Sequence, residues 1–474
     1  MVKTQFYDRK GEMGLLNRAY DEMNRSGNGS MLAIYGRRRV GKTEIVRMFL
    51  EGKPKTLYFY VDLAERSVIL SALSSAVQEQ LKENVSFSDF GSFFAYIKEH
   101  SAKRTFIVAI DEFQRFMEVA PEFITSLQKH WDISFKQQKV MILLVGSSIG
   151  MIQKITGSKA GALYGRATKV KVSPFRYQDF RHMFKELSEE EKILRYAVFG
   201  GTPYYLEKTK RFADTMTAVN ELLLKKGGEL SEEPKNLLEY ENVRIHAKYN
   251  SILQSISSGK EVLKEIQDFT KIPSTTLPPY IDKLDALLDL VEKNDPLLGK
   301  ERLRRYRIKD NFFRFWYRFI FENQTALHLG NTELVFGHIT ENISSYTGRI
   351  FEMVVKELLI SYNRKELDGN YLNFENIGSW WDRNGNEIDI LAYNTKEGTY
   401  LVGEVKWSSK AVNADEVDTL IRKTKLLHRG GKYTLLLVSK SGFTEQCIIK
   451  MQENRVLHLD LKDIARLFNA LGSG

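Results

Sequence analysis

The octet GRRRVGKT, residues 36–43, constrains the fold of this chain more than any other segment. It directly follows the apolar run 31–35 and opens a helical pattern at residues 44–49. The glycines Gly36 and Gly41 let the backbone turn tightly and bring its N–H groups close to a ligand, and the positive end of a helix dipole lies where the loop ends. A strand, a glycine-rich loop and a helix in this order predict a phosphate-binding loop in an α/β domain.

The side chains of this loop suit a nucleotide held together with Mg²⁺. We expect Lys42 to reach the β and γ phosphates and the Thr43 hydroxyl to bind Mg²⁺. The other loop positions expected to contact the nucleotide are Gly36, Arg39, Val40, Gly41 and Glu44. The sequence therefore predicts ATP and Mg²⁺ as cofactors.

A second acidic element follows the strand-forming run at residues 106–110, which ends in Asp111 and Glu112. A continuous apolar run is typical of a parallel strand buried on both faces, and ligands of α/β sheets bind at the carboxyl ends of such strands. We assign Asp111 to Mg²⁺, directly or through water, and Glu112 to the general base that polarises the attacking water. An ordinary charged loop after a strand is the alternative interpretation.

Further strand-like runs complete one domain. They lie at residues 31–35, 56–61, 106–110, 140–145 and 168–172, with helical patterns between them, and they predict a three-layer α/β domain. The fourth run ends in Gly146-Ser147-Ser148, so Ser147 or Ser148 is a candidate γ-phosphate sensor, or else a cap for the next helix. Arg166, before the fifth run, is a candidate γ-phosphate ligand in its own or a neighbouring subunit, or a solvated loop arginine.

Composition narrows the class of protein. A chain of 474 residues is too long for one core, so we expect roughly two to four domains. Neither a signal peptide nor an apolar run of membrane-spanning length is recognisable, so we expect a cytoplasmic protein without a membrane partner. The single cysteine, Cys447, excludes intramolecular disulfides and thiolate clusters, and the eight histidines lack ligand spacing. A net charge of +10 and a pI near 9.2 favour a polyanionic partner.

Helical patterns dominate the middle of the chain. Residues 181–238 predict a helical lid, and from residue 239 three helical patterns with a short turn predict a winged-helix domain. A basic hairpin would form the wing, and its arginines are expected to contact DNA phosphates: Arg302, Arg304, Arg305 and Arg307. A solvated strand face is the alternative. The aromatic segment 312–321 predicts a buried helix bridging two domains rather than a nucleic-acid stacking platform.

The C-terminal quarter carries a second acidic constellation. Residues 387–391 and 400–406 alternate as strands, and a turn centred between residues 396 and 397 places Asp389 opposite Glu404, with Lys406 on the same face. Carboxylates about 5 Å apart repel by roughly 3 kcal/mol at an effective dielectric constant near 20. Such a pair suggests Mg²⁺ or Mn²⁺, with Glu352 from a helical pattern completing the ligands.

The same constellation suggests catalysis. We expect Asp389, Glu404 and Lys406 to be catalytic, since the lysine would orient or deprotonate a water between the metal and a scissile phosphate. An acid and a lysine two positions apart on a strand are common, however, so an ordinary strand remains the alternative for each residue taken singly.

Most of the chain resembles a known family. Residues from about 6 to 325 resemble the archaeal-type ATPases of the AAA+/STAND-related P-loop class, and the portion from about Gly348 is similar to the restriction-endonuclease-like domain often fused to them. The resemblance is carried by Asp8-Arg9-Lys10-Gly11-Glu12, the loop 36–43, Asp111-Glu112, Gly146-Ser147-Ser148, Gly165-Arg166, Gly201-Thr202-Pro203, and by Glu352, Asp389, Glu404 and Lys406. It implies strand order 5-1-4-3-2, Walker-type ATP binding, a winged helix and a PD-(D/E)XK-type C-terminal domain.

These observations give an α/β fold in four parts and two leading hypotheses for function. The expected parts are a P-loop ATPase domain (1–180), a helical lid (181–238), a winged-helix domain with the bridging helix (239–325) and a restriction-endonuclease-like domain (340–474). The first hypothesis is an ATP-regulated DNA-binding protein with a Mg²⁺-dependent nuclease domain. The second is a switch ATPase whose C-terminal modules bind DNA or protein without cleavage. A motor or chaperone is less favoured, and a homo-oligomer is possible under either hypothesis.

Overall fold

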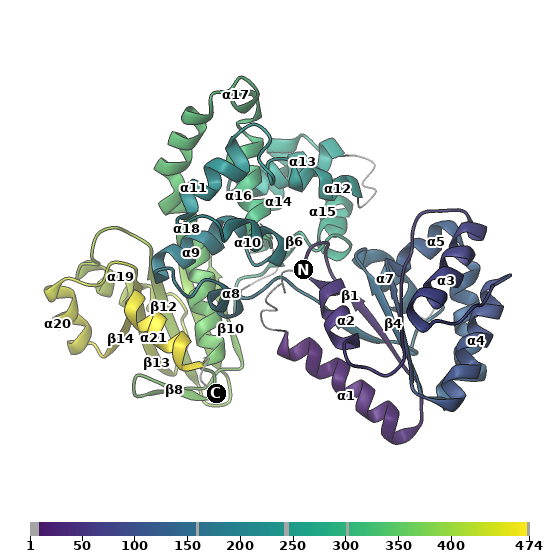
Figure 1. Cartoon of the computed structure of the whole chain (residues 1–474). Coiled ribbons are helices and arrows are strands. Elements are labelled where there is room, and N and C mark those ends of the chain that lie inside the picture. The colour runs from purple at the N-terminus through teal and green to yellow at the C-terminus, as the bar shows by residue number, and fades with distance from the viewer. Residues whose placement is uncertain (1–8, 158–160, 241–245, 300–302, 472–474) are drawn as a thin grey trace. The chain divides into compact units, whose positions relative to one another are not determined.

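The structure is a computed structural model that describes residues 9–157, 161–240, 246–299 and 303–471. The chain divides into two compact units, one of Met1–Pro174 with Asp282–Asp289 and one of Phe175–Ile281 with Leu290–Gly474. The order of their helices and strands can be followed in Figure 1. The first change of unit lies close to the predicted end of the ATPase domain at residue 180, and the other predicted boundaries remain predictions.

The first unit is built on a five-stranded parallel sheet with the order β2-β3-β4-β1-β5. Its strands are β1 (Ser30–Tyr35), β2 (Thr56–Tyr60), β3 (Phe106–Asp111), β4 (Val140–Gly146) and β5 (Thr168–Lys171). All five lie where the hydrophobic runs predicted them. The order is the one that the family resemblance implies, and it places β4 between β1 and β3.

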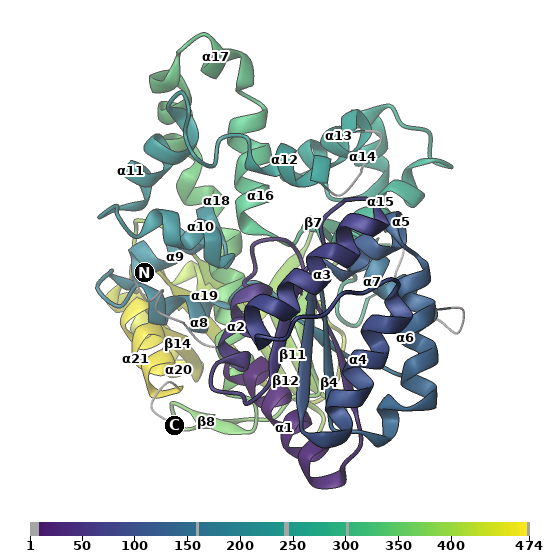
Figure 2. The same cartoon turned by 45° about the vertical axis from the view of Figure 1, so that its right-hand side comes forward.

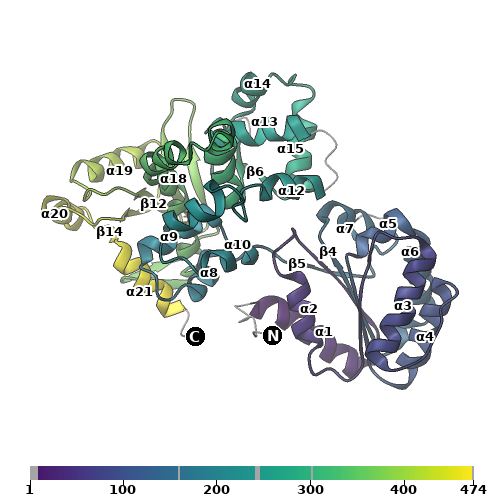
Figure 3. The same cartoon turned by 45° about the horizontal axis from the view of Figure 1, so that its top comes forward.

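Helices cover both faces of this sheet, as Figure 3 shows. They are α1 (Lys10–Ser26), α2 (Lys42–Leu50), α3 (Arg66–Leu81), α4 (Phe90–Lys103), α5 (Phe116–Val119), α6 (Glu122–Ile133) and α7 (Ile149–Thr156). Successive side chains of β3 enter different cores: Val108 packs in the core with α3, α4 and α6, whereas Ile107 and Ala109 pack in the core with α1 and α2. The period of two in a strand buried on both faces thus produces the predicted three-layer domain.

The second unit begins with short helices, in the segment predicted to be a lid. These are α8 (Tyr177–Met183), α9 (Glu189–Phe199), α10 (Pro203–Thr209), α11 (Thr215–Val219) and α12 (Glu233–Tyr240). They are tied to the long helix α18 (Thr332–Ser361): the Glu357 carboxylate accepts hydrogen bonds from the backbone N–H groups of Tyr177 (2.9 Å) and Gln178 (2.8 Å). The start of α8, just before the predicted lid, is therefore anchored on the helix that leads into the C-terminal domain.

Three helices and a two-stranded antiparallel sheet occupy the predicted winged-helix segment. They are α13 (His246–Ser257), α14 (Leu263–Thr270), α15 (Leu277–Ala286), β6 (Val291–Asn294) and β7 (Arg305–Ile308). The element order agrees with the predicted three helices and hairpin. The assignment as a DNA-binding winged helix remains a prediction.

The aromatic segment that follows is buried, as predicted, but it is not a single α-helix. Helix α16 (Asn311–Phe315) continues into a π-helical segment, Trp316–Phe321. Trp316 donates to the Ser231 carbonyl oxygen (2.6 Å) and the Tyr317 hydroxyl to Asn250 Oδ1 (2.7 Å). The segment thus bridges the lid region and α13, which confirms its structural interpretation.

The C-terminal part contains a second five-stranded sheet with the order β10-β11-β12-β13-β14. Its strands are β10 (Asn376–Trp381), β11 (Glu387–Asn394), β12 (Thr399–Lys406), β13 (Lys432–Ser439) and β14 (Val456–Leu459), and a small sheet pairs β8 (Lys365–Leu367) with β9 (Asn370–Leu372). The first two pairings are antiparallel and the last two are parallel. The sheet is accompanied by α17 (Gln324–His328), α18, α19 (Asp415–Lys425), α20 (Glu445–Glu453) and α21 (Leu461–Leu471).

Helix α18 contacts both the sheet strand β12 and the helices α9 and α21, and its course is visible in Figures 1 and 2. Cys447 is fully buried in the core between the sheet and α19 and α20, as its apolar surroundings predicted. No helix within the described ranges is long and apolar enough to cross a membrane.

Candidate functional site

The phosphate-binding loop joins the end of β1 to the start of α2. A Cβ at Gly36 would lie 2.1 Å from the Val172 carbonyl oxygen, so only glycine fits there. Gly41 has φ of 93° and Arg39 has φ of 71°, both in the left-handed region. The loop is further fixed by Arg9, whose Nη2 donates to the Val40 carbonyl oxygen at 2.7 Å. The glycines predicted from sequence therefore have the steric roles expected of a tight loop. Asp8, the first residue of the entry motif, lies outside the described residues.

Lys42 and Thr43 begin α2, where the loop meets the helix dipole. Lys42 is 6% exposed, and its ammonium group donates to the carbonyl oxygens of Gly36 (2.8 Å) and Arg37 (2.9 Å). It thus lies over the loop that it is predicted to serve. Thr43 Oγ1 donates to Asp111 Oδ2 at 2.7 Å, which joins the loop to the acidic end of β3.

Asp111 is 2% exposed and accepts hydrogen bonds from three groups. Besides Thr43, the Tyr58 hydroxyl donates to Oδ2 at 2.7 Å, and the Glu112 N–H donates to Oδ1 at 2.8 Å. Burial and the neighbouring Asp111 charge raise the pKa of Tyr58 well above its usual value, so it remains a donor. Sequence reasoning missed Tyr58, which reaches Asp111 from the neighbouring strand β2.

The oxygen atoms of Thr43 and Asp111 suit a hard divalent cation. Adjacent ligands of an octahedral Mg²⁺ with bonds of about 2.05 Å lie roughly 2.9 Å apart. Thr43 Oγ1 and Asp111 Oδ2 are 2.7 Å apart. The two side chains that sequence reasoning assigned to Mg²⁺ are therefore brought together.

Glu112 follows β3 in a left-handed conformation, with φ of 54°. Ser147 Oγ donates to Glu112 Oε2 at 2.8 Å, and Gln114 Nε2 donates to the same oxygen. Ser147 is 3% exposed and lies just beyond the end of β4. Of the two candidate serines, Ser147 thus contacts the predicted base. Ser148 is the N-cap residue that precedes α7, and its side chain makes no capping bond.

Arg166 does not reach the phosphate loop within its own chain. It lies two residues before β5, which pairs in parallel with β1, so it is near the start of these strands rather than their carboxyl ends. Its guanidinium group binds the Asp132 carboxylate at 3.0 and 2.7 Å and lowers the pKa of Asp132 to about 2. The role within one subunit is therefore not supported, and a role in a neighbouring subunit stays a prediction.

The second predicted site lies on β11 and β12. Ile390 pairs with Gly403, so the same antiparallel register sets Asp389 opposite Glu404, as the turn position predicted. Glu404 is 1% exposed, and its Oε1 accepts from Lys423 of α19 at 2.7 Å, while Oε2 lies 3.5 Å from Lys406 Nζ. Asp389 Oδ2 accepts from the Val405 N–H at 2.9 Å.

Burial makes these carboxyl groups weak acids. It raises the pKa of Glu352 to about 7, with the Asp389 charge as the next cause, and it raises the pKa of Asp389 and of Glu404. Lys356 lies one helical turn after Glu352, and burial lowers its pKa. The Lys356 ammonium group donates to Ser379 Oγ at 2.5 Å. Such groups with shifted pKa values are typical of functional sites, although structural ion networks shift pKa values as well.

The assignment of Glu352, Asp389 and Glu404 as metal ligands stays a prediction. Within the described part of the chain, no group of three His, Cys, Asp or Glu side chains could hold a metal ion. Both Glu404 oxygens instead contact ammonium groups, Oε1 that of Lys423 and Oε2 that of Lys406. Sequence reasoning missed Lys423 because it is brought to the strand from a separate helix.

The predicted basic wing also differs from expectation. Arg304 binds Asp295 (2.8 Å), Arg305 binds Glu387 (2.9 Å), and Arg307 lies 3.3 Å from Glu261. These three arginines therefore pair with acids of their own unit instead of presenting a row of open charges. The fourth, Arg302, lies outside the described residues.

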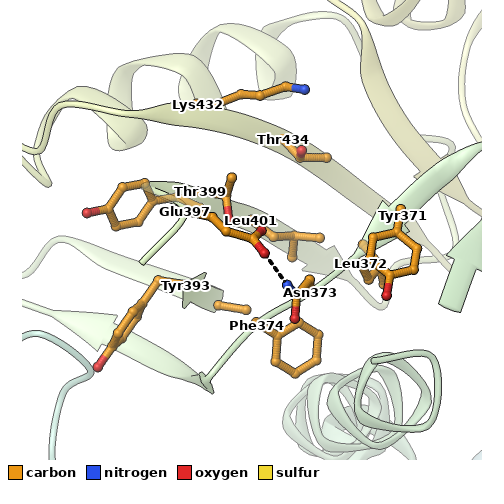
Figure 4. Close-up of a pocket in the computed structure, with 12 residues that line it drawn as sticks. Tyr371, Leu372, Asn373, Phe374, Tyr393, Glu397, Thr399, Leu401, Lys432 and Thr434 are labelled. Atoms are coloured by element: carbon orange, nitrogen blue, oxygen red, sulfur yellow. Dashed lines mark hydrogen bonds between the residues drawn. The ribbon is translucent and has the colours of Figure 1, made fainter. Parts of the chain in front are cut away.

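A cavity of about 100 Å³ opens at the other end of β11 and β12, near the turn that joins them. Figure 4 shows its lining, with Tyr393, Glu397 and Lys432 among the side chains and a hydrogen bond between Asn373 and Glu397. Tyr393 lies four residues along β11 from Asp389. The cavity is therefore separate from the acidic constellation.

A glycine-rich loop between a strand and a helix, bonded through Thr43 to the acid that ends β3, defines a P-loop nucleotide-binding domain of the ATPase class. Comparison with known families agrees: the family described as "ATPase domain predominantly from Archaea" matches residues 6–209. A second family, described as "Archaea bacterial proteins of unknown function", matches residues 316–417.

Similarity extends along most of the chain. An uncharacterized protein of Methanocaldococcus jannaschii is 31% identical over 432 residues, which are 89% of this chain and 92% of that protein. An uncharacterized ATP-binding protein of the same organism is 42% identical over 48 residues, 10% of this chain and 75% of that protein. The solved structure of a Walker-type ATPase of Pyrococcus abyssi has a TM-score of 0.51 at 21% identity and covers 66% of this chain and 97% of that one, which supports the fold.

The chain belongs to the same family as the uncharacterized M. jannaschii protein that it matches over 432 residues. It contains a domain of the archaeal ATPase type at residues 6–209. Its C-terminal domain is of the type found in archaeal and bacterial proteins of unknown function.

Proposed function

We propose that this ATPase binds DNA and that ATP binding and hydrolysis control metal-dependent cleavage of DNA by its C-terminal domain. The observation that carries the nuclease proposal is the placement of Asp389 opposite the buried Glu404 on the neighbouring strand, with Lys406 on the same face. Two carboxylates in such a position repel each other unless cations balance them. The net charge of +10 supports a polyanionic partner.

In the N-terminal unit, Lys42 would bind the β and γ phosphates, and Thr43 and Asp111 would hold Mg²⁺. Mg²⁺ held there would neutralise charge on the transferred phosphoryl group. Glu112 would accept the proton of the attacking water through Oε1, because its Oε2 already accepts from Ser147 and Gln114. The M. jannaschii relative whose name describes it as ATP-binding supports ATP as the nucleotide.

In the C-terminal domain, Glu352, Asp389 and Glu404 would hold Mg²⁺ or Mn²⁺. Such a metal supplies Lewis acidity and lowers the pKa of a bound water. Lys406 would orient that water against the phosphodiester. For this to happen, Glu404 has to release Lys423, which now occupies its Oε1.

A nuclease assay tests the proposal. Plasmid and branched DNA are incubated with Mn²⁺ and the wild-type protein, Lys42→Ala or Asp389→Ala. We expect cleavage by the wild type, loss of at least about 100-fold with Asp389→Ala, and altered nucleotide control with Lys42→Ala. Absence of metal-dependent cleavage on every substrate would refute the nuclease, and cleavage that survives Asp389→Ala would place it elsewhere.

A second candidate is a switch ATPase whose C-terminal domain binds DNA or protein without cutting. The ammonium groups of Lys423 and Lys406 favour it, because they already balance the Glu404 charge that a metal would otherwise balance. Calorimetric titration of Mn²⁺ into nucleotide-free wild type and Asp389→Ala distinguishes the two. A nuclease binds Mn²⁺ in the wild type and loses that binding with Asp389→Ala, whereas a pure interaction module binds none in the wild type.

A further inference from the structure

We propose that Gln114 is a positioning residue of the ATPase site, which fixes the catalytic carboxylate of Glu112 and the hydroxyl of Ser147 as one unit. The inference rests on the proposed role of Glu112 as general base. The three side chains form a closed ring of hydrogen bonds. Gln114 Nε2 donates to Glu112 Oε2 and to Ser147 Oγ (3.2 Å), and Ser147 Oγ donates to Glu112 Oε2 (2.8 Å).

The turn after β3 brings Gln114 into this position. Glu112 adopts a left-handed conformation, and a short 3-10 turn, Phe113–Arg115, follows it. Phe113 is fully buried on one side of this turn, and Arg115 Nη1 donates to the Val61 carbonyl oxygen at 2.8 Å on the other. The turn is therefore anchored at both ends, and the Gln114 side chain is directed back over the end of the sheet.

The orientation of the Gln114 amide is set by its surroundings. If the amide were flipped, its oxygen would lie against the Glu112 carboxylate oxygen, and two acceptors would repel each other. Its Oε1 instead lies over Gly146, where an added Cβ would be only 2.5 Å away. Gly146 thus leaves room for the amide beside Ser147.

Packing alone does not explain a glutamine at position 114. It is 4% exposed, and within the described residues its Oε1 has no hydrogen-bond partner. A buried acceptor without a donor destabilises the fold, so an apolar side chain of similar size would be favoured if only packing mattered. The Gln114 amide donates to Ser147, which is predicted to face the γ-phosphate, and to Glu112, which is predicted to face the attacking water. These two hydrogen bonds give a functional reason for a glutamine at this position.

The ring has a mechanistic consequence. Both of its donors bind Glu112 Oε2, so Oε1 is left to accept a proton from water. Ser147 lies beyond the end of β4, beside the β1 end that leads into the phosphate loop, since Gly146 pairs with Tyr35. The Ser147 hydroxyl is therefore joined to the base both directly and through the Gln114 amide.

Steady-state ATPase kinetics of Gln114→Leu test this role. We expect kcat to fall about 10- to 100-fold with the KM for ATP within about twofold, because ground-state binding is untouched. Gln153→Leu, on the exposed side of α7, is the matched control and should behave as wild type. In a double-mutant cycle, adding Ser147→Ala to Gln114→Leu should lower kcat much less than Ser147→Ala lowers it in the wild-type protein.

A second variant, Gln114→Glu, tests the same role if Gln114→Leu fails to fold. Gln114→Glu places a carboxyl group beside Glu112, and the introduced group can donate only when protonated. Its relative kcat should therefore rise as the pH falls from about 8 to 6, whereas that of Gln114→Leu should stay a constant fraction of wild type.

Two results overturn the inference: an unchanged kcat in Gln114→Leu, or losses that multiply independently with Ser147→Ala. Glu112→Gln separates this failure from that of the proposed function. If Glu112→Gln retains the wild-type kcat, the general base is wrong. If it is inactive while Gln114→Leu is unaffected, only the role of Gln114 is wrong.

Discussion

The two acidic sites of this chain differ in the donors that surround their carboxylates. Asp111 accepts from two hydroxyl groups and one backbone N–H, all of them neutral. Glu404 accepts from Lys423 and lies beside Lys406, both of them cationic. Neutral donors orient a carboxylate and leave its charge for a metal, whereas ammonium groups balance the charge themselves. Neutral donors thus hold Asp111, as expected of the proposed Mg²⁺ ligand, whereas ammonium groups of the protein contact Glu404.

The largest expected effect is the loss of ATP hydrolysis when the N-terminal site loses Lys42. Lys42→Ala should lower kcat/KM for ATP hydrolysis by about 100- to 1000-fold, because it removes a cation placed where phosphate charge develops. Arg47→Ala, on the same helix but 63% exposed, is the control and should retain activity. A Lys42→Ala protein that hydrolyses ATP at the wild-type rate would contradict the assignment of the loop.

The next effect concerns the ammonium group that balances Glu404. Lys423→Met should lower the free energy of unfolding at pH 7 by about 2–4 kcal/mol, since it leaves a buried carboxylate with only Lys406. Urea denaturation measures this loss, and the exposed Lys425 of the same helix provides the control Lys425→Met. Equal stability of the two variants would show that Lys423 does not neutralise Glu404.

The pH dependence of stability sharpens the account of the same site. Burial raises the pKa of Glu352 to about 7, above its value in the unfolded chain. Between about pH 4.5 and 7 the unfolded chain therefore loses this proton first, so stability falls as the pH rises through this window. Glu352→Gln should remove on the order of 2 kcal/mol of this fall and be more stable than wild type at pH 8. Parallel stability curves for the two proteins would exclude the raised pKa.

The smallest effect tests the neutral donors of Asp111. Tyr58→Phe should raise the Mg²⁺ concentration for half-maximal ATPase activity by about threefold to tenfold, because it removes one bond that orients the carboxylate. Tyr60→Phe, two residues along β2 and 44% exposed, is the matched control. A shift to lower Mg²⁺ concentration would mean that the hydroxyl competes with the metal instead of supporting it.

The features that sequence reasoning predicted correctly follow local rules. The strands of the first sheet followed from hydrophobic runs, and the loop from its two glycines. The placement of Asp389 opposite Glu404 followed from counting residues about the turn, because the period of a strand leaves only one register for a given turn centre.

The features that were missed depend on contacts between distant segments. Tyr58 and Lys423 reach their acids from other strands and helices, 53 and 19 residues away in sequence. Arg305 looked available for DNA because its partner Glu387 lies 82 residues further along. Whether a charged side chain is available to a ligand is therefore hard to predict from sequence, because the tertiary fold determines which partner neutralises it.

The central claim is that the nucleotide site controls the C-terminal acids, and the rate of Mn²⁺-dependent DNA cleavage with and without ATP tests it most directly. Wild type, Glu112→Gln and Lys42→Ala are compared at equal protein concentration. The account predicts that ATP changes the rate of DNA cleavage by the wild type. In Glu112→Gln the cleavage rate seen with ATP should last longer, because the bound ATP is not hydrolysed. In Lys42→Ala the cleavage rate should not respond to ATP. Cleavage at one rate in all three proteins, with or without ATP, would contradict it.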